Sequence, residues 1–202
     1  MMSPAQRALL KWARLVHVYL TMFGLLLLLF FAVTGFMLNH EEWLFGVDKP
    51  FTQTIEGKLP ANLVGDRSKE SDKLAIVEAL RRDFGVRGLV EMNSIEIEEG
   101  HIRIEFKAPS RLETVSINRE DGATTLNRES RGFANLLMDL HRGKSSGFWW
   151  SLLIDAVCAM LVVISATGLI LWSSLRGRAK HGLIVLIAGA LLGLATYCFG
   201  VP

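Results

Sequence analysis

Histidine is the residue type whose placement in this chain could support chemistry. Four of the five histidines flank long apolar segments, and only His101 lies within a polar region. The four are His17, His40, His141 and His181. A neutral imidazole is a good iron ligand through either ring nitrogen. Histidines at the ends of apolar segments indicate either a b-type haem held between helices or ordinary amphipathic anchors at a membrane surface.

Three apolar segments must position these histidines. They cover residues 15–38, 148–172 and 183–200, and each approaches or exceeds the roughly 20 apolar residues that cross a bilayer core. The first segment has no small-residue cleavage site, so it is interpreted as a retained anchor and not as a signal peptide. The sequence therefore predicts a membrane α-helical fold with three transmembrane helices and a small α+β domain inserted over residues 39–147.

The distribution of Lys and Arg predicts the orientation of the spans. Cations precede the first span and fill the short loop between the second and third, at Arg7, Lys11, Arg14, Arg176, Arg178 and Lys180. Loops rich in Lys and Arg stay in the cytoplasm. We therefore expect residues 1–14 and 173–182 to be cytoplasmic. The inserted domain and the C-terminus are then expected on the outer side, which is the periplasm in a bacterium.

This topology sorts the four histidines into two pairs. His17 and His40 are separated by about 34 Å along a helix that rises about 1.5 Å per residue, so one haem cannot bridge them. The sequence predicts an outer haem held by His40 and His141, and an inner haem held by His17 and His181. Glycines that could leave room for the cofactor lie near these ends, at Gly24, Gly35, Gly147 and Gly168.

The inserted domain has the pattern of one helix on a small antiparallel sheet. An amphipathic helix is expected over 72–84, with Leu74, Val77, Leu80 and Phe84 on its apolar stripe. Alternating residues predict strands over 94–98, 101–107, 113–118 and 123–126. Residues 133–140 are expected to form a short helix at the membrane surface. His101 lies opposite the apolar stripe of its strand, so it is predicted to be a solvated residue.

Asp155 is the one charged residue of the second span. It lies about 9 Å inside the span by helix rise, where an ionisable side chain is a functional candidate. It could transfer protons, or it could hydrogen-bond Thr34 or Asn39 at a similar depth, and the sequence leaves both readings open.

Other classes of function find no support in the sequence. Cys158 and Cys198 lie inside apolar segments, which excludes a disulfide framework and fits no zinc motif. No basic run with interleaved aromatic residues indicates nucleic-acid binding. The inserted domain contains neither a G-x-S-x-G motif nor a His-Glu-x-x-His motif.

Two groups of motifs resemble a known family. Arg14–His17 with Ala32–His40 resembles the first helix of PepSY-associated transmembrane proteins, and Leu140–Gly143 with Ser165–Trp172 resembles a later helix of that family. The inserted domain resembles a PepSY domain, including the stretch Ile117–Thr124. The resemblance covers nearly the whole chain.

The resemblance carries expectations about function. It implies a bacterial inner-membrane protein, and some larger members resemble haem-containing reductases that release iron from ferric siderophores. It therefore implies haem b, a ferric siderophore as substrate and an electron donor of unknown identity. The apolar segments imply membrane lipids as surroundings, and a homodimer could supply missing ligands across its interface. Other PepSY domains act as binding or regulatory modules for periplasmic partners, so a non-enzymatic membrane protein is the alternative.

Overall fold

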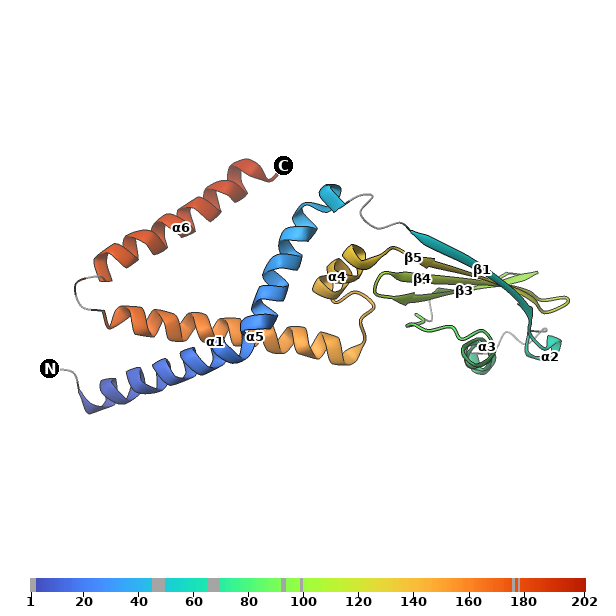
Figure 1. Cartoon of the computed structure of the whole chain (residues 1–202), viewed down its shortest axis with the longest axis horizontal. Helices are drawn as coiled ribbons and strands as arrows, with labels where there is room; N and C mark the ends of the chain where they lie inside the picture. The colour runs from blue at the N-terminus through green and yellow to red at the C-terminus, as the bar shows by residue number, and fades with distance from the viewer. Residues whose placement is uncertain are drawn as a thin grey trace. The chain divides into compact units, whose positions relative to one another are not determined.

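The computed structural model describes residues 3–44, 50–64, 70–91, 94–98, 100–175, 177 and 179–202. It divides into two compact units, Met1–Leu29 with Asp155–Pro202 and Phe30–Ile154. In the described part of the chain, three helices are long and apolar enough to cross a membrane, in agreement with the three predicted apolar segments. They are α1 (Pro4–Asn39), α5 (Phe148–Ser173) and α6 (Ala179–Gly200), drawn in Figure 1. Arg176 and Arg178, on which the orientation partly depends, lie outside the described residues.

Helix α1 begins well before its apolar segment because a capping box starts it. Ser3 Oγ accepts a hydrogen bond from the backbone N–H of Gln6 at 3.2 Å, and Gln6 Oε1 accepts one from the N–H of Ser3 at 2.9 Å. Pro4 occupies the first helical position, where its missing N–H costs nothing. The basic residues Arg7, Lys11 and Arg14 are therefore part of the same helix as the first span.

The inserted domain contains a five-stranded antiparallel sheet with strand order β1-β5-β4-β3-β2. Four strands match the predicted ones, with longer bounds for β4 and β5. The strands are β1 (Phe51–Lys58), β2 (Ile95–Ile97), β3 (His101–Ala108), β4 (Arg111–Asn118) and β5 (Ala123–Ser130). Strand β1 was not predicted, because Ile55 is the only aliphatic residue inside it and the strand lies exposed at the edge of the sheet.

Helix α3 (Glu70–Asp83) covers one face of this sheet (Figure 1). Its Ile76, Val77 and Leu80 pack with Ile104 and Phe106 of β3 in one buried cluster. The predicted apolar stripe is correct at Val77 and Leu80, and Phe84 is partly buried against the same core. It is wrong at Leu74, whose side chain is 62% exposed, because the buried face of the helix includes Ile76 and Ala79 instead.

A buried ion pair lies within the same sheet. Glu113 of β4 is fully buried, and its Oε1 accepts a hydrogen bond from Nε of Arg128 on β5 at 2.5 Å. Its Oε2 accepts a second bond from the backbone N–H of Arg87 at 2.9 Å. The carboxylate therefore joins two strands to the loop that follows α3.

Three further described elements are short. They are η1 (Glu41–Leu44), α2 (Ala61–Val64) and α4 (Phe133–Arg142). Along the chain, η1 and α4 lie between the sheet and the apolar helices, and α2 lies between β1 and α3. Helix α4 matches the predicted surface helix and extends two residues beyond it, so that His141 lies in its last turn. A left-handed Gly143 (φ 67°) ends α4, which is the backbone conformation that glycine adopts without strain.

Candidate functional site

His141 lies against a threonine and a glycine of α1. Its Nδ1 is 2.8 Å from Thr34 Oγ1. A Cβ built at Gly35 would lie 3.1 Å from Cε1 of the imidazole, so a side chain at this position would press on the ring. The ring also meets Phe31 edge-on, with centroids 5.4 Å apart. Thr34 is almost fully buried, which places this hydrogen bond away from water.

The contacts of Thr34 indicate which nitrogen of His141 carries the proton in the neutral ring. The threonine hydroxyl has a single hydrogen, and Oγ1 lies 2.7 Å from the carbonyl oxygen of Phe30, which can only accept. The hydroxyl therefore donates to Phe30 and accepts from Nδ1–H of His141. This leaves the free lone pair of the ring on Nε2, the nitrogen available to a metal.

His17 makes the same kind of contact with α5. Its Nδ1 is 3.1 Å from the carbonyl oxygen of Ile164 and 3.1 Å from Thr167 Oγ1. Because a carbonyl oxygen cannot donate, Nδ1 again carries the proton and Nε2 keeps the lone pair. A Cβ built at Gly168 would lie 3.3 Å from Cε1 of this ring.

The two sites therefore share one design. In each, a histidine donates its Nδ1 proton to a neighbouring helix at a Thr-Gly pair, and the glycine leaves space for the ring. Gly35 and Gly168 were expected to leave room for a haem; in the structure each lies against an imidazole, and the expectation about haem stays a prediction. Gly24 instead lies against the side chain of Met160, and nothing lies within 4 Å of a Cβ built at Gly147.

Three contacts hold α4 so that His141 reaches α1. Arg142 forms an ion pair with Glu41. The indole N–H of Trp150 donates to the carbonyl oxygen of Leu140 at 2.8 Å. On the sheet side, Asp139 Oδ2 accepts a hydrogen bond from the backbone N–H of Ser110 at 2.9 Å. Residues 139–142 thus connect the β3–β4 turn, α1 and the start of α5, all within the unit Phe30–Ile154.

The other two candidate ligands are placed differently. His40 Nδ1 lies 3.0 Å from the carbonyl oxygen of Phe36, so its Nε2 also carries the free lone pair. Its ring is stacked on the ring of Phe36, with centroids 4.3 Å apart, and its centroid lies 3.9 Å from that of the Trp43 ring. His181 is exposed in the first turn of α6 and has no hydrogen bond to any residue that the structure describes. The pairing of His40 with His141 and of His17 with His181 stays a prediction.

Asp155 and His101 are both exposed. No hydrogen bond or ion pair joins Asp155 to another described residue, and the Thr34 hydroxyl is already engaged by His141 and Phe30. The exposure of His101 on β3 confirms the prediction that it is a solvated strand residue.

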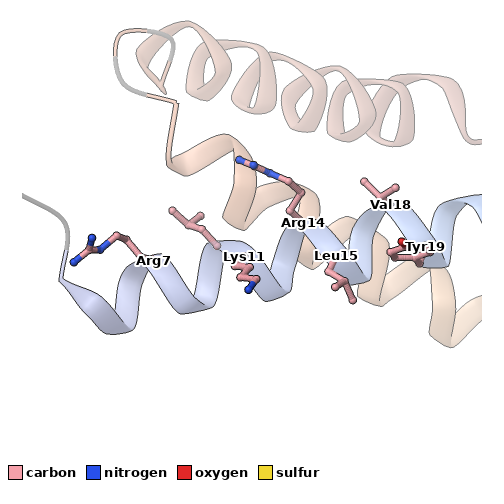
Figure 2. A pocket seen from close by; sticks show the side chains of 7 residues that line it. Arg7, Lys11, Arg14, Leu15, Val18 and Tyr19 are labelled. Carbon is pink, nitrogen blue, oxygen red and sulfur yellow. The ribbon is translucent and has the colours of Figure 1, made fainter.

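A groove of about 490 Å³ follows the basic part of α1 (Figure 2). All its lining residues belong to this one helix: Arg7, Leu10, Lys11, Arg14, Leu15, Val18 and Tyr19. In Figure 2 the basic side chains extend from different sides of the helix, so the groove is an open surface with no enclosed site. Its mixture of cations and apolar residues suits contact with lipid headgroups.

The donor set fits a haem better than a bare metal ion. Among the residues that the structure describes, no three His, Cys, Asp or Glu side chains come together as a metal site. A haem iron needs only one or two axial nitrogens from the protein, because the macrocycle supplies the rest. Imidazoles with a fixed Nδ1 proton and a free Nε2 meet that requirement.

Comparison with known proteins gives the family. The family model described as "Putative PepSY_TM-like" matches residues 10–202, which covers the three apolar helices and the inserted domain. No curated protein and no solved structure matches the chain. The match confirms the family indicated by the Thr-Gly and histidine motifs, and the chain belongs to the PepSY_TM-like family of membrane proteins.

Proposed function

We propose that this chain is a b-type haem protein of the bacterial inner membrane that passes electrons across the membrane to ferric iron or a ferric siderophore in the periplasm. The observation that carries the proposal is the fixed tautomer of His17 and His141. In both, Nδ1–H donates a hydrogen bond to an oxygen of a neighbouring helix, so in the neutral ring the lone pair lies on Nε2. Metal-binding histidines use the same outer hydrogen bond to set the tautomer and the ring orientation.

His141 and His40 would hold haem at the outer end of α1, and His17 and His181 would hold it at the inner end. Haem bound there supplies one-electron transfer at a potential set by axial ligands and burial. Thr34 and Thr167 would orient their histidines by accepting a hydrogen bond from Nδ1–H. The Arg142–Glu41 pair holds the α4 turn that carries His141.

The distribution of Lys and Arg supports a periplasmic position for the inserted domain. The family resemblance supports a ferric substrate and a separate electron donor. Asp155 would serve as a proton-transfer residue if reduction consumes protons, since an exposed acid in a membrane span has no partner among the described residues. A homodimer would bring a second set of histidines and could complete an axial pair.

The direct test is an absorption spectrum of the detergent-purified full chain, with haem quantified per chain. We expect a Soret band that shifts on reduction with dithionite. His141→Ala and His17→Ala should each reduce the haem content or convert low-spin haem to a five-coordinate form. His101→Ala is the matched control. Because His101 is an exposed histidine of the sheet, its replacement should change neither the haem content nor the spin state of the haem.

The outcome separates the two candidate functions. Colourless protein from haem-replete cells would reject the haem proposal and favour a binding or regulatory module. Full haem content and an unchanged low-spin spectrum in both His40→Ala and His141→Ala would reject the outer pair. If haem is present, reduction of a ferric siderophore by proteoliposomes supplied with a reductant on the inner side would test the electron path itself.

A further inference from the structure

A cationic cleft lies where the sheet meets the loop between α4 and α5. It measures about 150 Å³ and lies inside the unit Phe30–Ile154. The β3–β4 hairpin forms one side, and the end of α4 with the following loop forms the other. The lining residues are Glu105, Lys107, Ala108, Arg111, Leu112, Arg131, Asp139, Lys144 and Ser145.

The acids of this cleft are already engaged. The Glu105 carboxylate forms two ion pairs: Oε1 lies 3.6 Å from a guanidinium nitrogen of Arg103, and Oε2 lies 3.7 Å from Nζ of Lys107. Asp139 accepts a hydrogen bond from the backbone N–H of Ser110. Both carboxylates therefore have partners within the protein.

Three cations of the lining have no such partner. Arg111, Arg131 and Lys144 are exposed, and none forms an ion pair with another residue in the described part of the chain. All three line the same small cleft, where a bound anion would interact favourably with each of them. Two of them are arginines, whose planar donor forks match the oxygens of a phosphate.

The backbone around the cleft is held in an uncommon conformation. Among the described residues, Ser110 (φ 59°) and Ser145 (φ 55°) are the non-glycine residues with positive φ. Ser145 lines the cleft, and Ser110 lies in the turn between the lining residues Ala108 and Arg111. Such conformations cost free energy and concentrate at binding sites, where the surrounding structure enforces them. At Ser110 the enforcing contacts are visible, because its hydroxyl donates to Gly132 O and its N–H donates to Asp139.

The cleft lies close in the sequence to the start of a candidate membrane span. Lys144 and Ser145 immediately precede α5, whose apolar run begins at Phe148. Trp149 is 79% exposed at the start of that helix, as expected for an aromatic residue at headgroup level. A basic side chain just outside a span lies within reach of lipid phosphates.

We propose that this cleft binds a phosphate group through Arg111, Arg131 and Lys144. The phosphate belongs to an anionic phospholipid headgroup or to a free phosphate ion, which share the chemistry that the three cations recognise. Binding there would fix the β3–β4 hairpin against the loop that leads into α5. The site is independent of haem and lies beyond the function proposed above.

The test uses the full chain in neutral detergent. Wild-type protein is titrated with phosphatidylglycerol, with phosphatidylcholine and with inorganic phosphate, and bound ligand is measured by native mass spectrometry and calorimetry. The variant R111Q/R131Q removes two cations. The control R82Q/R87Q removes two exposed arginines elsewhere in the domain. We expect the first variant to bind roughly 30-fold more weakly and the control to bind like wild type.

The two sources give different results. Tight phosphatidylglycerol binding that millimolar phosphate does not displace identifies a lipid headgroup, whereas phosphate binding that competes with the lipid identifies the free ion. Binding of neither ligand to wild type, or equal binding to both double variants, overturns the proposal. Equal affinity for phosphatidylcholine also overturns it. Thermal unfolding checks that each variant folds, and Lys144→Gln in the loop replaces R111Q/R131Q if that variant does not.

Discussion

Replacing Thr34 by valine removes one hydroxyl and nearly keeps the shape of the side chain. In the native chain this hydroxyl donates to Phe30 O and accepts the Nδ1 proton of His141. The valine variant leaves that N–H without an acceptor at a position where Thr34 is only 1% exposed. We therefore expect the variant to lose the fixed tautomer of His141 and part of the stability that joins α4 to α1.

The expected magnitude follows from the environment of the bond. Hydrogen bonds between helices in membranes contribute about 0.6 kcal/mol on average and up to about 1.7 kcal/mol. The short 2.8 Å contact and the burial of Thr34 favour the upper part of that range. For a chain of this length, 1 kcal/mol changes the melting temperature by about 2–4 °C, so a loss of about 1.2–1.7 kcal/mol should make Thr34→Val melt roughly 2–7 °C lower.

Thr21→Val is the matched control on the same helix. Thr21 Oγ1 is buried and has no hydrogen-bond partner among the described residues, so its removal should leave the melting temperature unchanged or slightly raised. Thermal unfolding in detergent gives the stability, and ¹⁵N NMR of histidine-labelled protein gives the tautomer. Wild-type His141 should show an unprotonated Nε2, with a mixture in Thr34→Val. Equal melting shifts in both variants, or an unchanged tautomer in Thr34→Val, would refute the role given to this hydroxyl.

Three further predictions concern other parts of the chain. Glu113→Ala should destabilise the chain by about 3–5 kcal/mol, because it leaves Arg128 largely buried without its partner; thermal unfolding measures this, and a loss below 1 kcal/mol contradicts it. Asp155→Asn should retain fold and haem while slowing ferric reduction, and an unchanged rate would remove its proton-transfer role. Topology reporters fused after Ser110 should read as periplasmic and those fused near Arg178 as cytoplasmic, and a cytoplasmic signal at Ser110 would reverse the proposed orientation.

Most of the fold could be predicted because hydrophobic patterns are strong in this chain. The three apolar segments and the alternating residues of β3 identified their elements directly. Strand β1 gave no such signal, since an exposed edge strand needs few apolar residues and is stabilised by its full-length pairing with β5. Leu74 was placed in the core because the predicted stripe missed Ile76 and Ala79, which lie on the buried face of α3.

The sequence indicated candidate residues for the site, but it did not indicate which residues they contact. The sequence identified His17 and His141, but Thr34 was considered only as a partner for Asp155. An apolar helix has no polar face that reveals its rotation, so the neighbour of each histidine could not be read from the pattern. The signal that could have found it is the recurrence of Thr-Gly in both spans, at Thr34-Gly35 and Thr167-Gly168.

The separation of each histidine from its threonine has a consequence for biosynthesis. Thr34 is made 107 residues before His141, and His17 is made 150 residues before Thr167. At about 5–20 residues per second, α1 spends on the order of 5–30 s without these partners. During that interval the His17 imidazole lacks Thr167 as its hydrogen-bond partner, and the Thr34 hydroxyl lacks His141. A chain interrupted before His141 can complete neither contact, so unfinished copies lack both contacts between α1 and the later helices.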